Sequence, residues 1–590
     1  MSERGRTLLH GSATREAWDF ARVEEFWARF SPLSPYARDA KDERPVLSER
    51  PAIEDLYDAT EAALSLIGRS PGPALDRVAY HLRRLPRIPL ASLAEPGRNL
   101  ELVELFQVKK FLSNYRSILA LLDEPARRFF GLEFRSAELA ARLDLGGSDP
   151  ETFFVAEAYH ESLPAIRREI EETDASLAAL RGGATALLRD RLGIDFAGRD
   201  FIIVPHDEAR GLLSACSESD REAPLPGLAV EAYDGASCIV RLQEGAAALE
   251  LEERRSRLES EEREVESAVL LSLSAAVIAE LPRLGDYINA ICDFDLALAR
   301  ARLCREYGLV RPRLDSDSLR VRSGRFLPCA WDCRELGLAY TPLDLDLPEP
   351  AAVLFGSNMG GKTVALQSLV FFQILAQSGH FVPAEQFESR VHRRIVYVGE
   401  LDAGRGRDAS KGLSGFGFEI RSFVEAVSGC AAGGGAGRVA DAALRQDGES
   451  GSEAEGIFAA LDEFARTTAS HEAEAMLSAA LELLAVRKGS RSLFATHFHG
   501  VERVAGVRFL RMRGLDRGAA GMALDSAEPL AERIRRINGM MRYEIVEERG
   551  DEESESDALA IASLLGLDPD IVGRAEYFYR QAAARRARGE

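Results

Sequence analysis

Three features are scarce in this sequence. Seven cysteines are scattered over 590 residues, and the one close pair, Cys329 and Cys333, has no nearby histidine to complete a zinc site. Buried thiols in a reducing cytoplasm are therefore favoured over a metal site. No run approaches the roughly 18 uncharged apolar residues of a membrane-spanning helix, and residues 1–22 lack a signal-peptide core. The sequence predicts a cytoplasmic protein without a membrane partner.

Positively charged residues are also few relative to negatively charged ones. Lysine and arginine number 74 against 95 acidic residues, for a net charge of −21. Proteins that wrap nucleic acid usually carry a basic footprint, so any DNA contact here must be a local patch. The apolar fraction of 46% is ordinary for a globular protein. The length predicts roughly three to five units of about 100–200 residues each.

The first 190 residues show mainly helical periodicity. Amphipathic stretches at 53–67 and 100–122 predict helices, and residues 166–192 continue the helical pattern with many charges. The pattern then changes to that of strands. Short apolar runs occur at 201–204, 228–230 and 238–242, and the last two flank the turn Asp234-Gly235. These runs predict a small β-rich insert.

Helical periodicity returns at 246–281, where Leu251, Leu258 and Val265 recur every seven residues among dense glutamate and arginine. This seam predicts a long antiparallel coiled-coil arm, with a solvated helix packed on one neighbour as the alternative. A helix pair flanking a β-rich insert predicts an arm with a tip.

From residue 348 onward, short apolar strands alternate with helices, which is typical of a mainly parallel α/β sheet. A glycine-rich stretch at 430–456 interrupts this pattern and indicates a flexible loop. The acidic run at 551–557 is interpreted as a solvated loop, and residues 558–588 as helical.

The strongest motif begins where the apolar strand 351–355 ends. It has the form G-x-x-x-x-G-K-T and precedes an apolar helix. Backbone N–H groups of such a loop cradle phosphates, aided by the helix dipole. Lys362 is expected to reach the β- and γ-phosphates and the Thr363 hydroxyl to bind Mg²⁺. The predicted binding residues are Gly356, Ser357, Asn358, Met359, Gly360, Gly361, Lys362 and Thr363.

A second apolar strand ends in paired carboxylates. Asp462 is predicted to orient Mg²⁺, and Glu463 to polarise the attacking water, because in-line hydrolysis needs a base at the γ-phosphate. Alone, such a pair would be better interpreted as a helix cap after a buried strand. The upstream phosphate loop makes the catalytic role the favoured one.

A third strand, 492–496, ends at His497. A histidine at the carboxyl end of such a strand lies beside the ligand crevice, where it can donate a hydrogen bond to the γ-phosphate. A lone histidine is more often structural, but its spacing from the acid pair favours function. His499 is a weaker candidate.

Together these motifs resemble the MutS family of dimeric DNA-repair ATPases, relatives of the ABC class. Asn358 to Thr363 resembles its N-M-G-G-K-[ST] loop, and 494–498 its F-A-T-H-[YF] segment. The stretch from Leu461 to Ala473 is similar to D-E-x-G-R-G-T-S-x-x-D-G, with Ala465, Thr467 and Ala473 at glycine positions. Segments 414–420 and 560–575 resemble the signature segment and the subunit-joining helices.

The resemblance implies a P-loop (ABC-type) ATPase domain of α/β class, preceded by a mostly helical lever domain with a small β-rich clamp insert. It also implies ATP and Mg²⁺ as cofactors and a homodimer in which Ser414 reaches the partner's γ-phosphate. The implied divisions are an N-terminal helical extension (1–50), lever (51–190), clamp (191–245), returning lever (246–325), ATPase (326–550) and dimerisation segment (551–590).

Two hypotheses for function follow, and both keep the ATPase. The first is an ATP-hydrolysing homodimeric clamp on DNA in mismatch repair or recombination-related processing. The second is a family offshoot that remodels or assembles a protein partner. It is favoured by residues 193–245, which carry ten acidic residues and only four arginines, and by the lack of a mismatch-reading Phe-x-Glu motif outside the ATPase. An inactive scaffold is a third alternative, which the intact set of motifs opposes.

Overall fold

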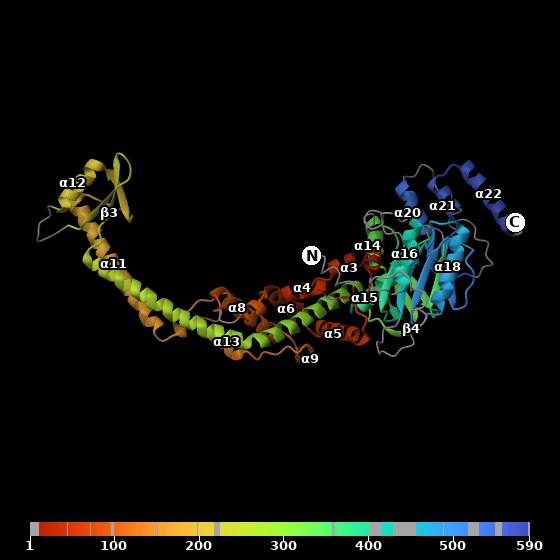
Figure 1. Ribbon diagram of the computed structural model, residues 1–590, viewed down its shortest axis with the longest axis horizontal. Coiled ribbons are helices and arrows are strands. Elements are labelled where there is room, and N and C mark those ends of the chain that lie inside the picture. Colours follow the sequence, from red (N-terminus) through yellow and green to blue (C-terminus); the bar gives the residue numbers. More distant parts are fainter. Residues whose placement is uncertain are drawn as a thin grey trace. The chain divides into compact units, whose positions relative to one another are not determined.

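The computed structural model (Figure 1) describes residues 11–587 except 44, 71, 96–98, 148, 150, 197–198, 218–224, 357–359, 400–414, 429–455, 488, 499, 517–529 and 549–556. The chain divides into two compact units. The first comprises Met1–Arg83, Leu121–Leu132 and Asn289–Glu590, and the second comprises Arg84–Ala120 and Glu133–Ile288.

The second unit contains a helical pair and a small sheet. Its elements are α7 (Leu90–Leu93), α8 (Leu102–Leu121), α10 (Ala137–Leu143), η1 (Glu157–Tyr159), α11 (Leu163–Leu192), β1 (Phe201–Pro205), α12 (His206–Ser217), β2 (Leu228–Ala232), β3 (Ser237–Leu242) and most of α13 (Ala246–Tyr307).

The strands of this unit lie where the sequence pattern predicts them. They form an antiparallel sheet of order β1-β3-β2, with Phe201 opposite Arg241 and Leu228 opposite Leu242. One face of the sheet buries Val204 and Val240 against helix α12 and the end of α11. Burial of this small core holds the insert together as a structured element.

Helices α11 and α13 form the predicted pair. Arg167 on α11 contacts Glu262 at 2.6 Å and Glu266 at 2.8 Å on α13. Arg255 on α13 contacts Asp174 on α11 at 2.6 Å. These contacts show that α11 lies beside α13, as the sequence pattern predicts.

Helix α13 differs from the sequence prediction in length, because it continues through Pro282 to Tyr307. It is also the one helix among the described residues that is long and apolar enough to cross a membrane, by length and composition only. The sequence prediction considered only runs without any charged residue, whereas this 18-residue stretch of α13 includes at most two. Of that 18-residue stretch, 22% is buried within the structure.

The first unit contains two sheets and most helices. Its helices are α2 (Arg15–Phe20), α3 (Val23–Arg29), α4 (Pro35–Glu43), α5 (Arg50–Arg69), α6 (Gly72–Arg84), α9 (Glu124–Phe129), α14 (Leu327–Leu336), α15 (Lys362–Gln377), α16 (Gly415–Ser428), α18 (Ser470–Ala485), α20 (Leu530–Met540), α21 (Asp557–Leu565) and α22 (Pro569–Ala587). Its strands are β4 (Asp315–Gly324), β5 (Leu343–Leu347), β6 (Ala351–Phe355), β7 (Gln386–Arg390), β8 (Arg394–Val398), β9 (Ile457–Asp462), β10 (Arg491–Thr496), β11 (Val507–Leu515) and β12 (Met541–Glu547).

The larger sheet has the order β12-β11-β6-β10-β9-β8 and is parallel except for the β11–β12 pair. A mainly parallel sheet is therefore present, as the alternating pattern predicts. The second sheet, of order β5-β4-β7, is antiparallel. Both belong to the same unit.

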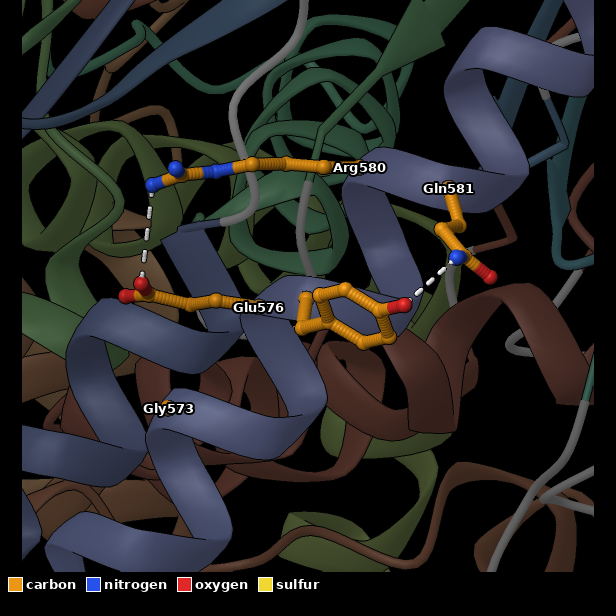
Figure 2. Close-up of a pocket in the computed structure, with 5 residues that line it drawn as sticks. Gly573, Glu576, Arg580 and Gln581 are labelled. Carbon is orange, nitrogen blue, oxygen red and sulfur yellow. Dashed lines mark hydrogen bonds and ion pairs between the residues drawn. The ribbon is translucent and has the colours of Figure 1, made fainter.

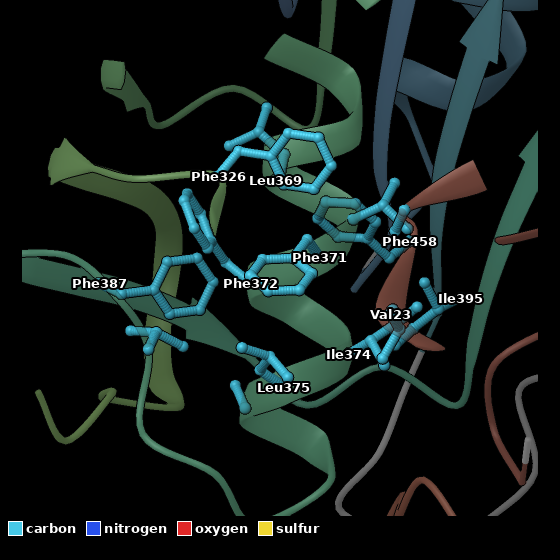
Figure 3. Close-up of a cluster of buried hydrophobic side chains, with 14 of the residues drawn as sticks. Val23, Phe326, Leu369, Phe371, Phe372, Ile374, Leu375, Phe387, Ile395 and Phe458 are labelled. Atoms are coloured by element: carbon cyan, nitrogen blue, oxygen red, sulfur yellow. The ribbon is translucent and has the colours of Figure 1, made fainter. Parts of the chain in front are cut away.

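Helix α15 provides the centre of the largest apolar core. Nearly all of its residues are buried, and Figure 3 shows its phenylalanines and aliphatic side chains between Phe387 of β7 and Phe458 of β9. Phe371 meets Phe326 edge-on at 5.3 Å, and Phe372 meets Phe387 at 6.0 Å. Because aromatic packing fixes this helix, it also fixes the position of its first residues, Lys362 and Thr363.

The N-terminal segment belongs to this core rather than lying apart from it. Ser12 and Thr14 exchange backbone hydrogen bonds with Ile395 at the β8 edge of the larger sheet. Phe20 stacks on Tyr397 of β8, with ring centroids 3.7 Å apart. The local sequence pattern shows no sign of this packing.

We expect Phe20→Ala to lower the free energy of unfolding by about 3–5 kcal/mol, because it removes a buried ring and leaves a cavity beside β8. Phe129→Ala is the matched control, since Phe129 is 50% exposed and should change stability by less than about 1 kcal/mol. Urea unfolding followed by circular dichroism measures both. Equal effects would contradict the packing role of the N-terminal segment.

Candidate functional site

The site lies at one edge of the larger sheet, where three parallel strands end together. Thr496 of β10 is opposite Phe355 of β6, and Ala495 is opposite Asp462 of β9. The next residues along the three strands therefore leave the sheet at the same edge, which is where open α/β sheets bind ligands.

The phosphate loop follows β6, and its ends are described. Gly356 and Gly361 have φ angles of +155° and +88°, and Gly361 caps α15. A Cβ on Gly361 would lie 2.9 Å from Cδ1 of Tyr543, so both conformation and space require glycine there. Gly360 is buried. Ser357, Asn358 and Met359 lie outside the described residues.

Lys362 is the first residue of α15 and is 4% exposed. Its Nζ donates a hydrogen bond to the Gly356 carbonyl oxygen at 2.6 Å, across the mouth of the loop. Burial lowers the pKa of Lys362, and the nearby Glu463 and Asp462 carboxylates oppose that shift. An ammonium group held at the N-terminus of a helix is suited to an anionic ligand such as phosphate.

Thr363 and Asp462 meet although they are 99 positions apart in the chain. The Thr363 hydroxyl donates to Oδ2 of Asp462 at 2.8 Å. The other carboxylate oxygen, Oδ1, is buried and has no hydrogen-bond partner among the described residues. Burial raises the pKa of Asp462, and the Thr363 hydrogen bond opposes this shift. A hydroxyl beside an unsatisfied carboxylate oxygen fits Mg²⁺, which prefers oxygen ligands.

Glu463 turns away from the strand with a φ angle of +53°. Its backbone N–H donates to the Ala495 carbonyl oxygen at 2.9 Å, so β10 holds this turn in place. Its Oε1 lies 3.6 Å from Nδ1 of His497, and its Oε2 lies 3.5 Å from a guanidinium nitrogen of Arg466. His497 is 44% exposed and thus accessible to a ligand. The structure brings both predicted catalytic residues together.

The loop after Glu463 connects the site to α16. Thr467 donates to Glu419 of α16 at 3.2 Å, and the rings of Phe464 and Phe423 are 4.7 Å apart. Ala465 is buried with a φ angle of +62°. A glycine would adopt this conformation without strain, whereas alanine costs about 1 kcal/mol or more. Ser414, which immediately precedes α16, lies outside the described residues, as does His499.

Three residues near the site were not predicted for it. Met512 of β11 and Tyr543 of β12 pack against Gly356 and Gly361, and Arg466 faces Glu463. Arg466 stands in the motif-like stretch after the acid pair, so a local signal for it existed. Met512 and Tyr543 belong to no motif, and their proximity follows only from the order of the strands.

The cysteines take no part in this site. The described cysteines are free thiols, and no group of three or more histidine, cysteine or acidic residues in the described part of the chain is arranged to hold a metal ion. Burial and the neighbouring Cys333 raise the pKa of Cys329 to about 12, which keeps its thiol protonated at neutral pH. Cys430 lies outside the described residues.

At neutral pH, we expect Asp462→Asn to raise the free energy of unfolding when Mg²⁺ and nucleotide are absent. Because the pKa of Asp462 is raised by burial, its ionised form is less stable in the folded chain than in the unfolded one. This cost is complete above the folded pKa and absent below the unfolded value of 3.8.

The gain in the free energy of unfolding from Asp462→Asn should therefore disappear as the pH falls toward 3.8. Urea unfolding across a pH series measures it. Asp55→Asn on the exposed face of α5 is the control and should show no such gain. A loss of stability at neutral pH in Asp462→Asn would contradict the argument.

Comparison with known proteins identifies similar chains. No family model matches the chain. It is 30% identical to the DNA mismatch repair protein MutS of Natronomonas pharaonis over 260 residues, which are 43% of this chain and 27% of the relative. Identity to MutS of Paracoccus denitrificans is 25% over 585 residues (98% and 58%), and identity to endonuclease MutS2 of Ruminiclostridium cellulolyticum is 23% over 541 residues (90% and 60%).

The chain thus spans at most about three fifths of the length of these relatives. Two of the alignments nevertheless include nine tenths or more of this chain, so the similarity extends over both compact units as well as the motifs. These alignments support membership of the chain in the MutS family.

Proposed function

We propose that the chain is a Mg²⁺-dependent ATPase whose P-loop, ABC-type domain is built on the larger sheet. The observation that carries this proposal is the hydrogen bond between Thr363 and Asp462, with the unsatisfied Oδ1 of Asp462 beside it. Lys362 stands at the start of the same helix as Thr363. A hydroxyl, a carboxylate and an ammonium group at one sheet edge are what a metal–nucleotide ligand requires.

Each residue then has a distinct role. Thr363 and Asp462 hold Mg²⁺, which neutralises phosphate charge when it is bound. Lys362 binds the phosphates, along with the backbone N–H groups of residues 356–361. Glu463 accepts a proton from the attacking water, and His497 donates a hydrogen bond to the terminal phosphate. Arg466, facing Glu463 on the other side, orients the carboxylate.

A homodimer completes this proposal. The last helix, α22, leaves large apolar side chains exposed, among them Ile571 and Phe578, each 56% exposed. Beside them, α22 carries a surface hollow (Figure 2), where Glu576 pairs with Arg580 and Tyr577 accepts a hydrogen bond from Gln581. Exposed aromatic surface favours association with a second copy. In that dimer, Ser414 approaches the nucleotide of the other subunit.

We propose DNA as the cargo, in mismatch repair or recombination-related processing, because the relatives are named for mismatch repair. The alternative is a protein partner. It is supported by the insert around β1 to β3, where acidic residues outnumber arginines. The free thiols are consistent with the reducing cytoplasm as the place of action.

Glu463→Gln should lower ATP turnover by about two to four orders of magnitude while ATP binding persists, because an amide cannot accept the proton but keeps the shape of the side chain. Steady-state phosphate release and nucleotide binding measure the two properties. Glu425→Gln, on the surface of α16, is the control. Full turnover in Glu463→Gln would refute the assignment of the base.

The cargo is tested by binding of heteroduplex, branched and plain duplex DNA across a salt series. If DNA is the cargo, we expect binding at low salt that weakens steeply as salt rises, because phosphate contacts release counterions. Arg241→Gln on β3 should weaken it, whereas Arg421→Gln on α16 should not. If no DNA binds even at low salt, the DNA proposal is wrong and the protein partner is favoured.

A further inference from the structure

A cavity of 280 Å³ lies within the first unit, at the opposite end of α15 from the phosphate loop. The 16 residues of α15 place its two ends about 24 Å apart. The cavity walls come from the N-terminal segment, α5, the last turns of α13 and the residue after α15. Its lining includes Trp27, Phe30, Lys41, Leu296, Arg300 and Ser378.

Two cationic side chains of the lining converge on one aromatic ring. Nζ of Lys41 lies 5.8 Å from the centroid of the Phe30 ring, and Cζ of Arg300 lies 5.7 Å from it. No aspartate or glutamate lines the cavity. Within the described part of the chain, Lys41 forms no close ion pair, and Asp42 and Glu24 act on it only at longer range. The lining residues thus carry two positive charges and no negative one.

The remaining walls are apolar and add no charge. Trp27, Phe30 and Leu296 are almost fully buried. His380 packs behind the aromatic walls, 4.9 Å from Phe30 and 5.3 Å from Trp27 between ring centroids. Burial lowers the pKa of His380 well below its usual value, so its ring is neutral. Flat aromatic walls around two cations favour a ligand that is flat, apolar and negatively charged.

We propose that this cavity binds a small organic monoanion, a carboxylate attached to a flat apolar body. Its volume is below the range of about 300–1,000 Å³ that is typical of sites for drug-sized ligands, so the ligand is small. A carboxylate matches the guanidinium of Arg300 and the ammonium of Lys41. A phosphate dianion is disfavoured, because desolvating a second charge in an apolar cavity costs more than two cations recover.

This site is distinct from the proposed nucleotide site. Ser378, in its lining, directly follows α15, whose first residue is Lys362. Leu296 and Arg300 lie on the last part of α13. A ligand here would join the end of α13 to the end of α15, and would stabilise this unit without competing with nucleotide for space.

Benzoate is a suitable probe, because it has one carboxylate on one aromatic ring, and benzamide is its neutral counterpart of the same shape. By isothermal titration calorimetry of the full chain, we expect saturable binding of one benzoate per chain. Benzamide should bind about tenfold more weakly or not at all. Lys41→Met should weaken benzoate binding about tenfold and leave benzamide unchanged.

Two further variants make the test decisive. Lys110→Met is the matched control in the second unit and should bind benzoate as the unaltered chain does. Ala52→Phe fills the cavity from α5 without changing charge and should abolish binding. Absence of benzoate binding, insensitivity to Lys41→Met and Ala52→Phe, or displacement of benzoate by ATP would overturn the proposal. None of these outcomes depends on whether the chain hydrolyses ATP.

Discussion

The register of β10 between β6 and β9 is the constraint on which the site depends. Parallel pairing makes the three strands end at the same edge, with Thr496 opposite Phe355 and Ala495 opposite Asp462. The residues that follow them come from segments far apart in the chain, and no local interaction would bring them together. The hydrogen bond from Glu463 N–H to Ala495 extends this register beyond the strand, which is why the carboxylate lies beside His497 rather than in solvent.

How much of this was predictable from the sequence depends on whether the signal is local. The phosphate loop, the acid pair and the strand before His497 are contiguous motifs, and their strand–loop–helix setting follows from periodicity. Met512 and Tyr543 lie near Gly356 and Gly361 because β11 and β12 are on the side of β6 opposite to β10. No short segment of the sequence predicts this strand order. The N-terminal segment illustrates the same limit, since Phe20 finds Tyr397 across most of the chain.

The residues that suit this site for ligand binding also weaken the fold. Burial raises the pKa of Asp462 and lowers that of Lys362, so both groups are held where their charged forms are poorly solvated. Ala465 adds backbone strain at a φ angle of +62°. The aromatic core around α15 offsets these costs. Perturbed groups of this kind persist at functional sites because a ligand compensates for them when it binds.

The negative charge of the chain matters for what the α11–α13 arm can bind more than for the candidate site. Four arginines of the α11–α13 pair form ion pairs within the protein: Arg167 with Glu262 and Glu266, Arg181 with Glu244 and Glu252, Arg254 with Glu169, and Arg255 with Asp174. Exposed ion pairs are each worth only about 0–1 kcal/mol, so a duplex would be able to recruit these arginines. Each recruitment would, however, leave a glutamate or aspartate facing the phosphates. A basic protein surface would in turn face these arginines, but residues 193–245 carry ten acidic residues and four arginines, so the net charge there attracts a basic surface and repels a duplex. The charges of the arm therefore discriminate between cargoes by what they repel, while the proposed nucleotide site is the same for either.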